Sequence, residues 1–219
     1  MLTKLYAWNL DFSQVSIIDS DALVTGPLTE AFSLLRSSSS STRIAAALAP
    51  TKPIVTEFVT DKFAGHFNAG VLFIKPSKEE YDTLVMHSQD RNYYRLELAE
   101  QNLLNEYYGG RFLGLPSAYN LSTVQRMFFL GRELIACAVS LYMQRQEYWD
   151  QLRPQAKVLH FAGPRKPWHM DADPHESVTL WRKTFKALVR NYSFTKHDFL
   201  TGQYSSGIES FDFDGLMSS

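Results

Sequence analysis

Apolar residues cluster in short continuous runs, and these runs predict the strands of the chain. They occupy Gln14–Asp19, Ile44–Leu48, Val71–Ile74 and Lys157–Phe161. A short run of this kind, bounded by turn residues, is typical of a buried strand rather than of a strand with one face in solvent. Because helical segments separate the runs, the pattern indicates an α/β protein whose sheet is flanked by helices.

Helical character marks six segments around these runs. They are residues 2–10, 28–36, 78–87, about 98–108, 124–152 and 176–190. Ser77 and Glu80 have the spacing of a capping box ahead of the third segment, and Gly109 with Gly110 ends the fourth. We therefore expect one domain over residues 1–192, followed by a tail over residues 193–219 that lacks a clear period and is partly disordered.

The composition narrows the class of protein. The 219 residues are 45% hydrophobic and carry a formal net charge of −1. This balance supports a substantial core and argues against a nucleic-acid partner, since nucleic-acid surfaces are basic. No apolar run reaches the ~20 residues of a membrane-spanning helix. The only cysteine, Cys137, lies in an apolar stretch and is interpreted as a buried, inert thiol.

Asp19-Ser20-Asp21 follows the first apolar run and is the first candidate for chemistry. In extended geometry, residues two apart point the same way, so the two carboxylates can converge on one cation. Two such charges repel unless a metal ion or a proton separates them. The tripeptide taken alone is more often a surface turn in which aspartate caps the backbone, so both interpretations stay open at this point.

His160 and Lys166 lie near the far end of the predicted domain and strengthen the metal interpretation. Carboxylates and an imidazole together are acceptable ligands for manganese, and a lysine a few residues on can hold a phosphate as a point charge. His160 taken alone is more often a structural histidine. A metal-dependent hydrolase using Asp19 and Asp21 as acid and base is the weaker alternative, because their spacing places them on one side of a ligand.

The order of six short sequence blocks resembles that of the glycogenin-like glycosyltransferases, a retaining family on the GT-A nucleotide-diphosphosugar fold. The blocks are Leu2-Thr3-Lys4-Leu5 with Trp8 and Leu10, Asp19-Ser20-Asp21, Phe67–Val71, Glu100–Asn105, Leu115–Leu121 and His160–Trp168. The resemblance implies an α/β GT-A fold with a Rossmann-like mixed sheet. It also implies transfer of a sugar from a UDP-sugar, with retention and with Mn²⁺, to a glycan or protein acceptor, and it leaves a homodimer open.

The same resemblance assigns roles to individual residues. It implies that Asp19, Asp21 and His160 bind the metal ion. It also implies that Glu100 and Gln101 are catalytic residues beside the transferred sugar. It gives substrate binding to the following residues: Asn68, Ala69, Gly70, Glu97, Gly163 and Lys166. Gly163 would let the backbone approach the diphosphate, and neutral amides such as those of Asn68 and Gln101 suit sugar hydroxyls, because an amide both donates and accepts hydrogen bonds.

Two departures from the family pattern stand out. The family commonly has Gly-Asp-Gln where this chain has Ala99-Glu100-Gln101, which moves the carboxylate by about one methylene, and a misplacement of that order can cost ~10²-fold in rate. The stretch around residues 125–155 is longer than in glycogenin, so the acceptor side is expected to differ.

Family members also carry a further segment ahead of the part that matches Met1. That segment holds the first βαβ units and most contacts to uracil and ribose, so parallel strands would be expected beside Val15–Ile18. Two interpretations stay open: a fragment of a normal enzyme, which the complete metal-ligand set favours, or an inactive remnant that acts as a binding module. A cytoplasmic location is favoured, with the Golgi as the alternative if an anchor precedes Met1.

Overall fold

The computed structural model describes residues 3–49, 66–90, 92–95, 100–123, 149–163, 166–169 and 176–192. The chain divides into two compact units, Met1–His160 and Phe161–Ser219. Several predictions fall outside the described residues: Glu97, Cys137, most of the predicted helix 124–152, and the tail 193–219. The predicted extent of the domain, residues 1–192, therefore stays a prediction.

The first unit is built on a mixed four-stranded sheet with the strand order β1-β4-β3-β5. Its strands are β1 (Val15–Ile18), β4 (Phe67–Ile74), β3 (Ile44–Leu48) and β5 (Leu113–Leu115). The strand β4 pairs antiparallel with both of its neighbours, β1 and β3, whereas β3 and β5 run parallel. The predicted strand over Ile44–Leu48 is confirmed with the same bounds, and the one over Val71–Ile74 begins four residues earlier.

The strand β1 differs from its prediction in two ways. It was expected to be buried among parallel neighbours, but its described partner, β4, runs antiparallel to it, and all four of its residues are only half-buried. The strands β3 and β4 are buried along nearly their whole length, as predicted. An apolar run therefore identified the strand correctly but did not reveal how deeply it lies in the sheet or which way its partner runs.

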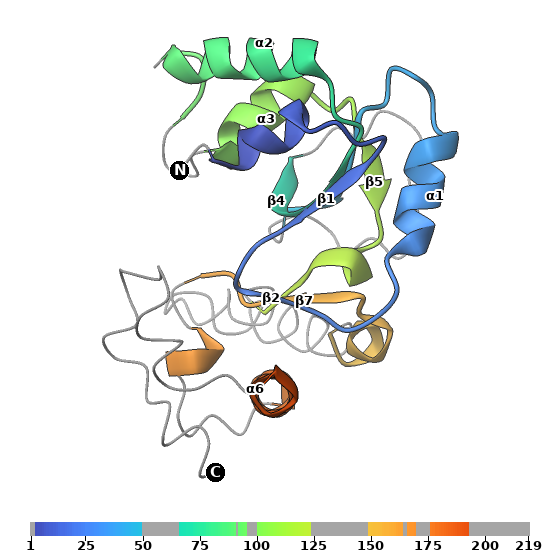
Figure 1. Ribbon diagram of the computed structural model, residues 1–219, viewed down its shortest axis with the longest axis vertical. Coiled ribbons are helices and arrows are strands. Elements are labelled where there is room, and N and C mark those ends of the chain that lie inside the picture. Colours follow the sequence, from blue (N-terminus) through green and yellow to red (C-terminus); the bar gives the residue numbers. More distant parts are fainter. Residues whose placement is uncertain are drawn as a thin grey trace, which may run out of the picture. The chain divides into compact units, whose positions relative to one another are not determined.

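Side chains of β3 and β4 alternate between two hydrophobic cores, because successive residues of a strand point to opposite faces. Leu72 and Ile74 pack into the core beneath the 3-10 helix η1 (Thr3–Asn9), α2 (Lys78–Gln89) and α3 (Glu100–Tyr108). Val71 and Phe73 pack into the opposite core, against α1 (Thr29–Ser37). Figure 1 shows α2 and α3 on one side of the sheet and α1 on the other. Both faces are thus covered, which explains the continuous apolar runs.

Only one of the two hydrogen bonds of the predicted capping box is present at the start of α2. Ser77 Oγ accepts a hydrogen bond from the Glu80 backbone N–H at 3.4 Å, as expected. The Glu80 carboxylate does not return a bond to Ser77, because Tyr108 Oη donates to it at 3.0 Å and the Ser77 N–H donates to the Trp8 carbonyl. Burial raises the pKa of Glu80 above its ordinary value despite the hydrogen bond from Tyr108.

A second, smaller sheet has the order β2-β7-β6 and brings distant parts of the chain together. It consists of β2 (Ala22–Val24), β7 (Val158–His160) and β6 (Leu121–Ser122), which follows the 3-10 helix η3 (Ser117–Asn120). The strand β2 runs antiparallel to β7, with Ala22 opposite His160, and β6 runs parallel to β7. The short 3-10 helix η4 (Arg153–Gln155) precedes β7.

The second unit contains the 3-10 helix η5 (Pro167–His169) and the helix α6 (Glu176–Tyr192). The ring of Trp168 lies 5.8 Å from that of Trp181, which in turn stacks on Phe185 at 5.1 Å, so these aromatic side chains pack η5 against α6. Among the described residues of the chain, no helix has the length and apolar character that crossing a membrane requires.

Candidate active site

The two aspartates of Asp19-Ser20-Asp21 converge through a turn rather than through an extended strand. The Ala22 N–H donates to the Asp19 carbonyl at 3.0 Å and closes the turn, while the Asp19 N–H donates to the Gly70 carbonyl at 2.8 Å. The first bond reverses the chain between β1 and β2, and the second ties the turn to β4. The predicted convergence is therefore present, but the prediction of an extended strand through Asp19 and Asp21 was wrong, because β1 ends at Ile18 and a turn brings the two carboxylates together.

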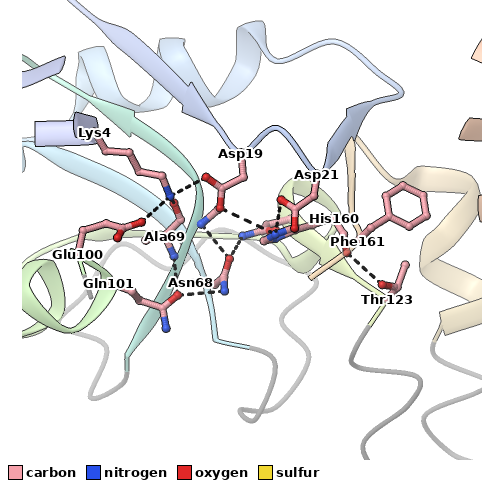
Figure 2. Close-up of polar contacts among 12 residues, drawn as sticks. Lys4, Asp19, Asp21, Asn68, Ala69, Glu100, Gln101, Thr123, His160 and Phe161 are labelled. Carbon is pink, nitrogen blue, oxygen red and sulfur yellow. Dashed lines mark hydrogen bonds and ion pairs between the residues drawn. The ribbon is translucent and has the colours of Figure 1, made fainter. Parts of the chain in front are cut away.

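His160 completes a three-residue cluster with the two aspartates (Figure 2). Its Nε2 lies 3.4 Å from Asp21 Oδ1 and 4.0 Å from Asp19 Oδ2. The residue opposite His160 in the β2–β7 pair is Ala22, the neighbour of Asp21. This strand pairing therefore places the imidazole beside the carboxylates. The sequence predicted all three residues, and the structure brings them together over a separation of 139 positions in the chain.

The cluster has the dimensions of a metal site. One ligand atom from each of the three residues lies within 4.8 Å of the other two. An ion about 2.1 Å from its ligands in octahedral geometry places neighbouring ligand atoms about 3 Å apart and opposite ones about 4 Å apart. The separations from Nε2 fall in that range, and two carboxylates with one imidazole form a suitable donor set. These three residues could hold a divalent cation.

The same geometry disfavours acid–base hydrolysis by the aspartates. Both carboxylates face the same imidazole nitrogen, with ligand atoms within 4.8 Å of one another. In a glycosidase, two catalytic carboxyl groups flank the scissile bond from opposite faces, about 5 Å or more apart. The pair is therefore arranged to share one ligand.

Lys4 is a site residue to which the sequence assigned no role. Its Nζ lies 2.6 Å from Asp19 Oδ1 and 2.9 Å from Glu100 Oε1, and it donates to the Ala69 carbonyl at 3.2 Å. Burial by itself lowers the pKa of Lys4, but the hydrogen bonds and charges of the two carboxylates outweigh it, so the pKa is raised. The signal that the sequence offered was the place of Lys4 in the block Leu2-Thr3-Lys4-Leu5, one of those that carry the family resemblance.

Lys4 leaves the cluster with a net negative charge. Asp19, Asp21 and Glu100 contribute three negative charges and Lys4 one positive charge, so the cluster carries a net charge of −2 when the imidazole is neutral. Lys4 pairs with Oδ1 of Asp19, whereas the other carboxylate oxygen, Oδ2, lies toward His160. The site therefore retains the charge that attracts a divalent cation, and Asp19 is oriented to offer one oxygen.

Side-chain hydrogen bonds join α3 to β4 and place Gln101 in the site. Asn105 accepts from the Phe67 N–H at 2.8 Å and donates to the Phe67 carbonyl at 2.9 Å, as a neighbouring strand would. One turn earlier, Gln101 Oε1 accepts from the Ala69 N–H at 3.0 Å and from Asn68 Nδ2 at 3.1 Å. The predicted residues Asn68, Ala69 and Gln101 thus lie in direct contact.

Gly70 is a glycine for a steric reason. A Cβ at this position would lie 2.1 Å from His160 Cε1 and 2.5 Å from its Nδ1. The imidazole therefore packs directly over the Gly70 backbone, where no side chain fits. The sequence predicted Gly70 as a substrate-binding residue, a role that stays a prediction, and it gave no sign of this contact with the metal cluster.

The remaining predicted residues belong to the second unit or lie outside the described residues. Gly163 has a φ of 88°, in the left-handed region that favours glycine. Lys166 Nζ donates to the Phe161 carbonyl at 2.9 Å. Glu97 lies outside the described residues. Phosphate binding by Gly163 and Lys166 therefore stays a prediction.

Comparison with known proteins identifies relatives over most of the chain. The model of Glycosyl transferase family 8 matches residues 1–172. The chain is 26% identical to Glycogenin-1 of Caenorhabditis elegans over 88% of its own length, and 27% identical to Glycogenin-1 of Mus musculus over 86%. These matches span 38% and 52% of the two relatives, so the chain corresponds to about half of their length or less.

Solved structures show the same architecture. The glycosyltransferase GlyE of Streptococcus pneumoniae TIGR4 superposes with a TM-score of 0.60 at 20% identity, over 88% of this chain and 45% of that one. The galactosyltransferase LgtC, in complex with donor and acceptor sugar analogues, superposes with a TM-score of 0.53 at 19% identity, over 90% and 68%. The mixed α/β architecture is therefore the GT-A fold, as the sequence predicted.

Proposed function

Because the chain belongs to glycosyl transferase family 8, we propose that it transfers a sugar from a UDP-sugar to a glycan or protein acceptor, with retention of configuration. The observation that carries this proposal is the cluster of Asp19, Asp21 and His160 beside the amides of Asn68 and Gln101. A cation site next to neutral amides matches the two parts of a sugar diphosphate, which are charged phosphates and uncharged hydroxyls.

We assign Asp19, Asp21 and His160 as the ligands of Mn²⁺. When bound, the ion supplies Lewis-acid stabilisation of the negative charge on the departing UDP. Lys4 holds the carboxylates of Asp19 and Glu100 in place. Preorganised charges of this kind lower the barrier because they need not rearrange during the reaction.

The amides serve the sugar end of the site in this proposal. Both hydrogen bonds to Gln101 Oε1 come from within the protein, so among the described contacts its NH₂ group is the part left to donate to a sugar hydroxyl. Glu100 stands where the family commonly has aspartate, and Lys4 holds its carboxylate beside Asp19. Gly163 and Lys166 are proposed to bind the diphosphate, through the backbone and the ammonium group respectively.

The proposal predicts that hydrolysis or transfer of a UDP-sugar requires a divalent metal ion. Chelation with EDTA should abolish turnover and added Mn²⁺ should restore it, because the charge on UDP is otherwise uncompensated. Asp21→Asn should lower turnover by about 10²-fold or more, since one ligand charge is lost. Asp82→Asn, at an exposed aspartate paired with Lys78, is the matched control. Turnover that persists in EDTA would refute the metal-dependent mechanism.

A catalytically inactive binding module is the second candidate, favoured by Glu100 in place of the family's aspartate. Thermal unfolding with UDP and Mn²⁺ separates the two. A ligand present at 100 times its Kd stabilises the folded state by about 2.7 kcal/mol. Stabilisation without turnover of any UDP-sugar would support the module, whereas stabilisation with turnover supports the transferase.

A further inference from the structure

We propose that Asn120 is a positioning residue that fixes the tautomer of His160 and so keeps Nε2 available to a metal ion. The sequence assigned Asn120 no role, and it touches neither of the predicted metal-binding aspartates in the contacts described. It lies at the end of η3 and is buried, like His160. This inference rests on the proposed function only in taking the cluster of Asp19, Asp21 and His160 as a metal site.

Two backbone N–H groups, which can only donate, fix the orientation of the amides beside them. The Ala69 N–H points at Gln101, so the atom that it meets must be the amide oxygen, Oε1. The Gly70 N–H points at Asn68, so the atom that it meets must likewise be the oxygen, Oδ1. The nitrogen of Asn68 is then free to donate to Gln101 Oε1, as observed at 3.1 Å. The orientations of both side-chain amides are therefore fixed by the backbone.

The orientation of Asn120 follows from that of Asn68. Asn68 Oδ1 is an acceptor, so Asn120 must present its nitrogen there, and Nδ2 donates to it at 2.8 Å. The other end of the amide, Oδ1, then faces His160 Nδ1 at 2.9 Å. An amide oxygen can only accept, so His160 Nδ1 must carry the proton.

Protonation at Nδ1 leaves the lone pair of His160 on Nε2. That nitrogen is the one that faces Asp21 Oδ1 at 3.4 Å and Asp19 Oδ2 at 4.0 Å. The opposite tautomer would set the Nδ1 lone pair against the Asn120 oxygen and direct an N–H into the ligand cluster. His160 and Asn120 are each only 4% exposed, so water is poorly placed to replace the bond between them. A hydrogen bond to the second nitrogen commonly sets the tautomer of a metal-bound histidine.

The hydrogen bonds form an unbroken chain from Gln101 through Asn68 and Asn120 to His160. Its first two members are the amides proposed to face the sugar, and its last is the proposed metal ligand. Asn120 is the link between them, which gives a specific reason for an asparagine at this position: its function needs one acceptor and one donor on the same planar group.

The test compares Asn120→Leu, which removes both hydrogen bonds, with Asn120→Asp, which keeps an acceptor for Nδ1–H. Asn92→Ala, at an exposed asparagine after α2, is the matched control. Long-range ¹H–¹⁵N NMR of the metal-free protein reports which His160 nitrogen carries the proton, and the signals are assigned by comparison with His160→Gln. Titration with Mn²⁺ alone reports metal affinity.

Wild type, Asn120→Asp and Asn92→Ala are expected to show the Nδ1–H form, whereas Asn120→Leu is expected to show both tautomers. Mn²⁺ affinity should fall by about 10- to 100-fold in Asn120→Leu, the usual effect of losing the partner of a ligand. Wild-type tautomer and affinity in Asn120→Leu would overturn the inference. If Asn120→Leu does not fold, a wild-type protein with its proton on Nε2 overturns it equally.

These measurements separate the inference from the proposed function, because neither requires a sugar nucleotide. A protein with the Nδ1–H form, and with weaker Mn²⁺ binding in Asn120→Leu, supports the role of Asn120 even when no UDP-sugar is turned over. That same lack of turnover would count against the transferase.

Discussion

Replacing Gly70 with alanine is expected to abolish Mn²⁺ binding and sugar transfer while the protein still folds. The new Cβ would lie 2.1 Å from His160 Cε1, a separation that non-bonded carbon atoms do not tolerate. His160 is buried and closes a strand, so the imidazole can yield only by leaving its place between Asn120 and the two aspartates. A displacement of about 1 Å in an active site can cost ~10²-fold in rate.

Manganese titration and a thermal unfolding curve of Gly70→Ala test this together. Gly26→Ala is the matched control, since its Cβ would meet Lys157 Cδ at 3.0 Å, and that side chain is flexible enough to move. Loss of metal binding with retained cooperative unfolding is the expected result. Wild-type Mn²⁺ affinity in Gly70→Ala would show that the imidazole can be moved without harm to the site, which contradicts the account of Gly70.

Replacing Lys4 with methionine is expected to separate metal binding from catalysis. The charge of the cluster would change from −2 to −3, so Mn²⁺ should bind at least as tightly as in the wild type. The transfer rate should nevertheless fall by about 10²-fold, because Asp19 and Glu100 lose the cation that orients both carboxylates. The side chains of Lys4, Asp19 and Glu100 are 19%, 27% and 16% exposed, so the pairing is only partly screened by water.

The stability of the same variant gives an independent measurement. Without metal, Lys4→Met should unfold at a lower temperature, because two partly buried carboxylates lose their partner. Mn²⁺ should then raise its unfolding temperature by more than it raises that of the wild type. Lys78→Met, which breaks an exposed pair with Asp82 worth about 0–1 kcal/mol, should change little. A Lys4→Met variant with weaker Mn²⁺ binding and an unchanged rate would contradict the role given to Lys4.

The parts of the fold that could be predicted are those whose signal is local. The strands β3 and β4 are buried on both faces, so nearly every residue in them is apolar, and their runs stand out in the sequence. The helix α2 has its cap at Ser77, and α3 ends before two glycines with positive φ. Each of these signals lies within a few residues of the element that it marks.

The strands β2 and β6 could not be predicted in the same way. They have three and two residues, too few for a period, and each forms only because β7 lies beside it. They are nevertheless the strands that set His160 beside Asp21 and the buried Asn120 beside His160. The antiparallel pairing of β1 with β4 is likewise a property of two segments about fifty residues apart, which no local pattern reports.

The residues of the candidate site likewise fall into those that the sequence could predict and those that it could not. Asp19, Asp21 and His160 could be predicted because their residue types are those of metal ligands and because their blocks resemble a known family. The role of Lys4 could not, since a lysine in a short helix is normally solvated and its two partners come from distant turns and helices. Asn120 belongs to the block Leu115–Leu121, but its role could not be predicted either, because that role depends on two backbone N–H groups of β4.

A calorimetric titration of Mn²⁺ into the wild type and into the double variant Asp19→Ala with His160→Ala tests directly whether these residues form a metal site. We expect one saturable Mn²⁺ site in the wild type and in an Asp82→Ala control, and no measurable binding in the double variant, because two of the three ligands are gone. Unchanged Mn²⁺ binding in the double variant would contradict a metal site at these residues.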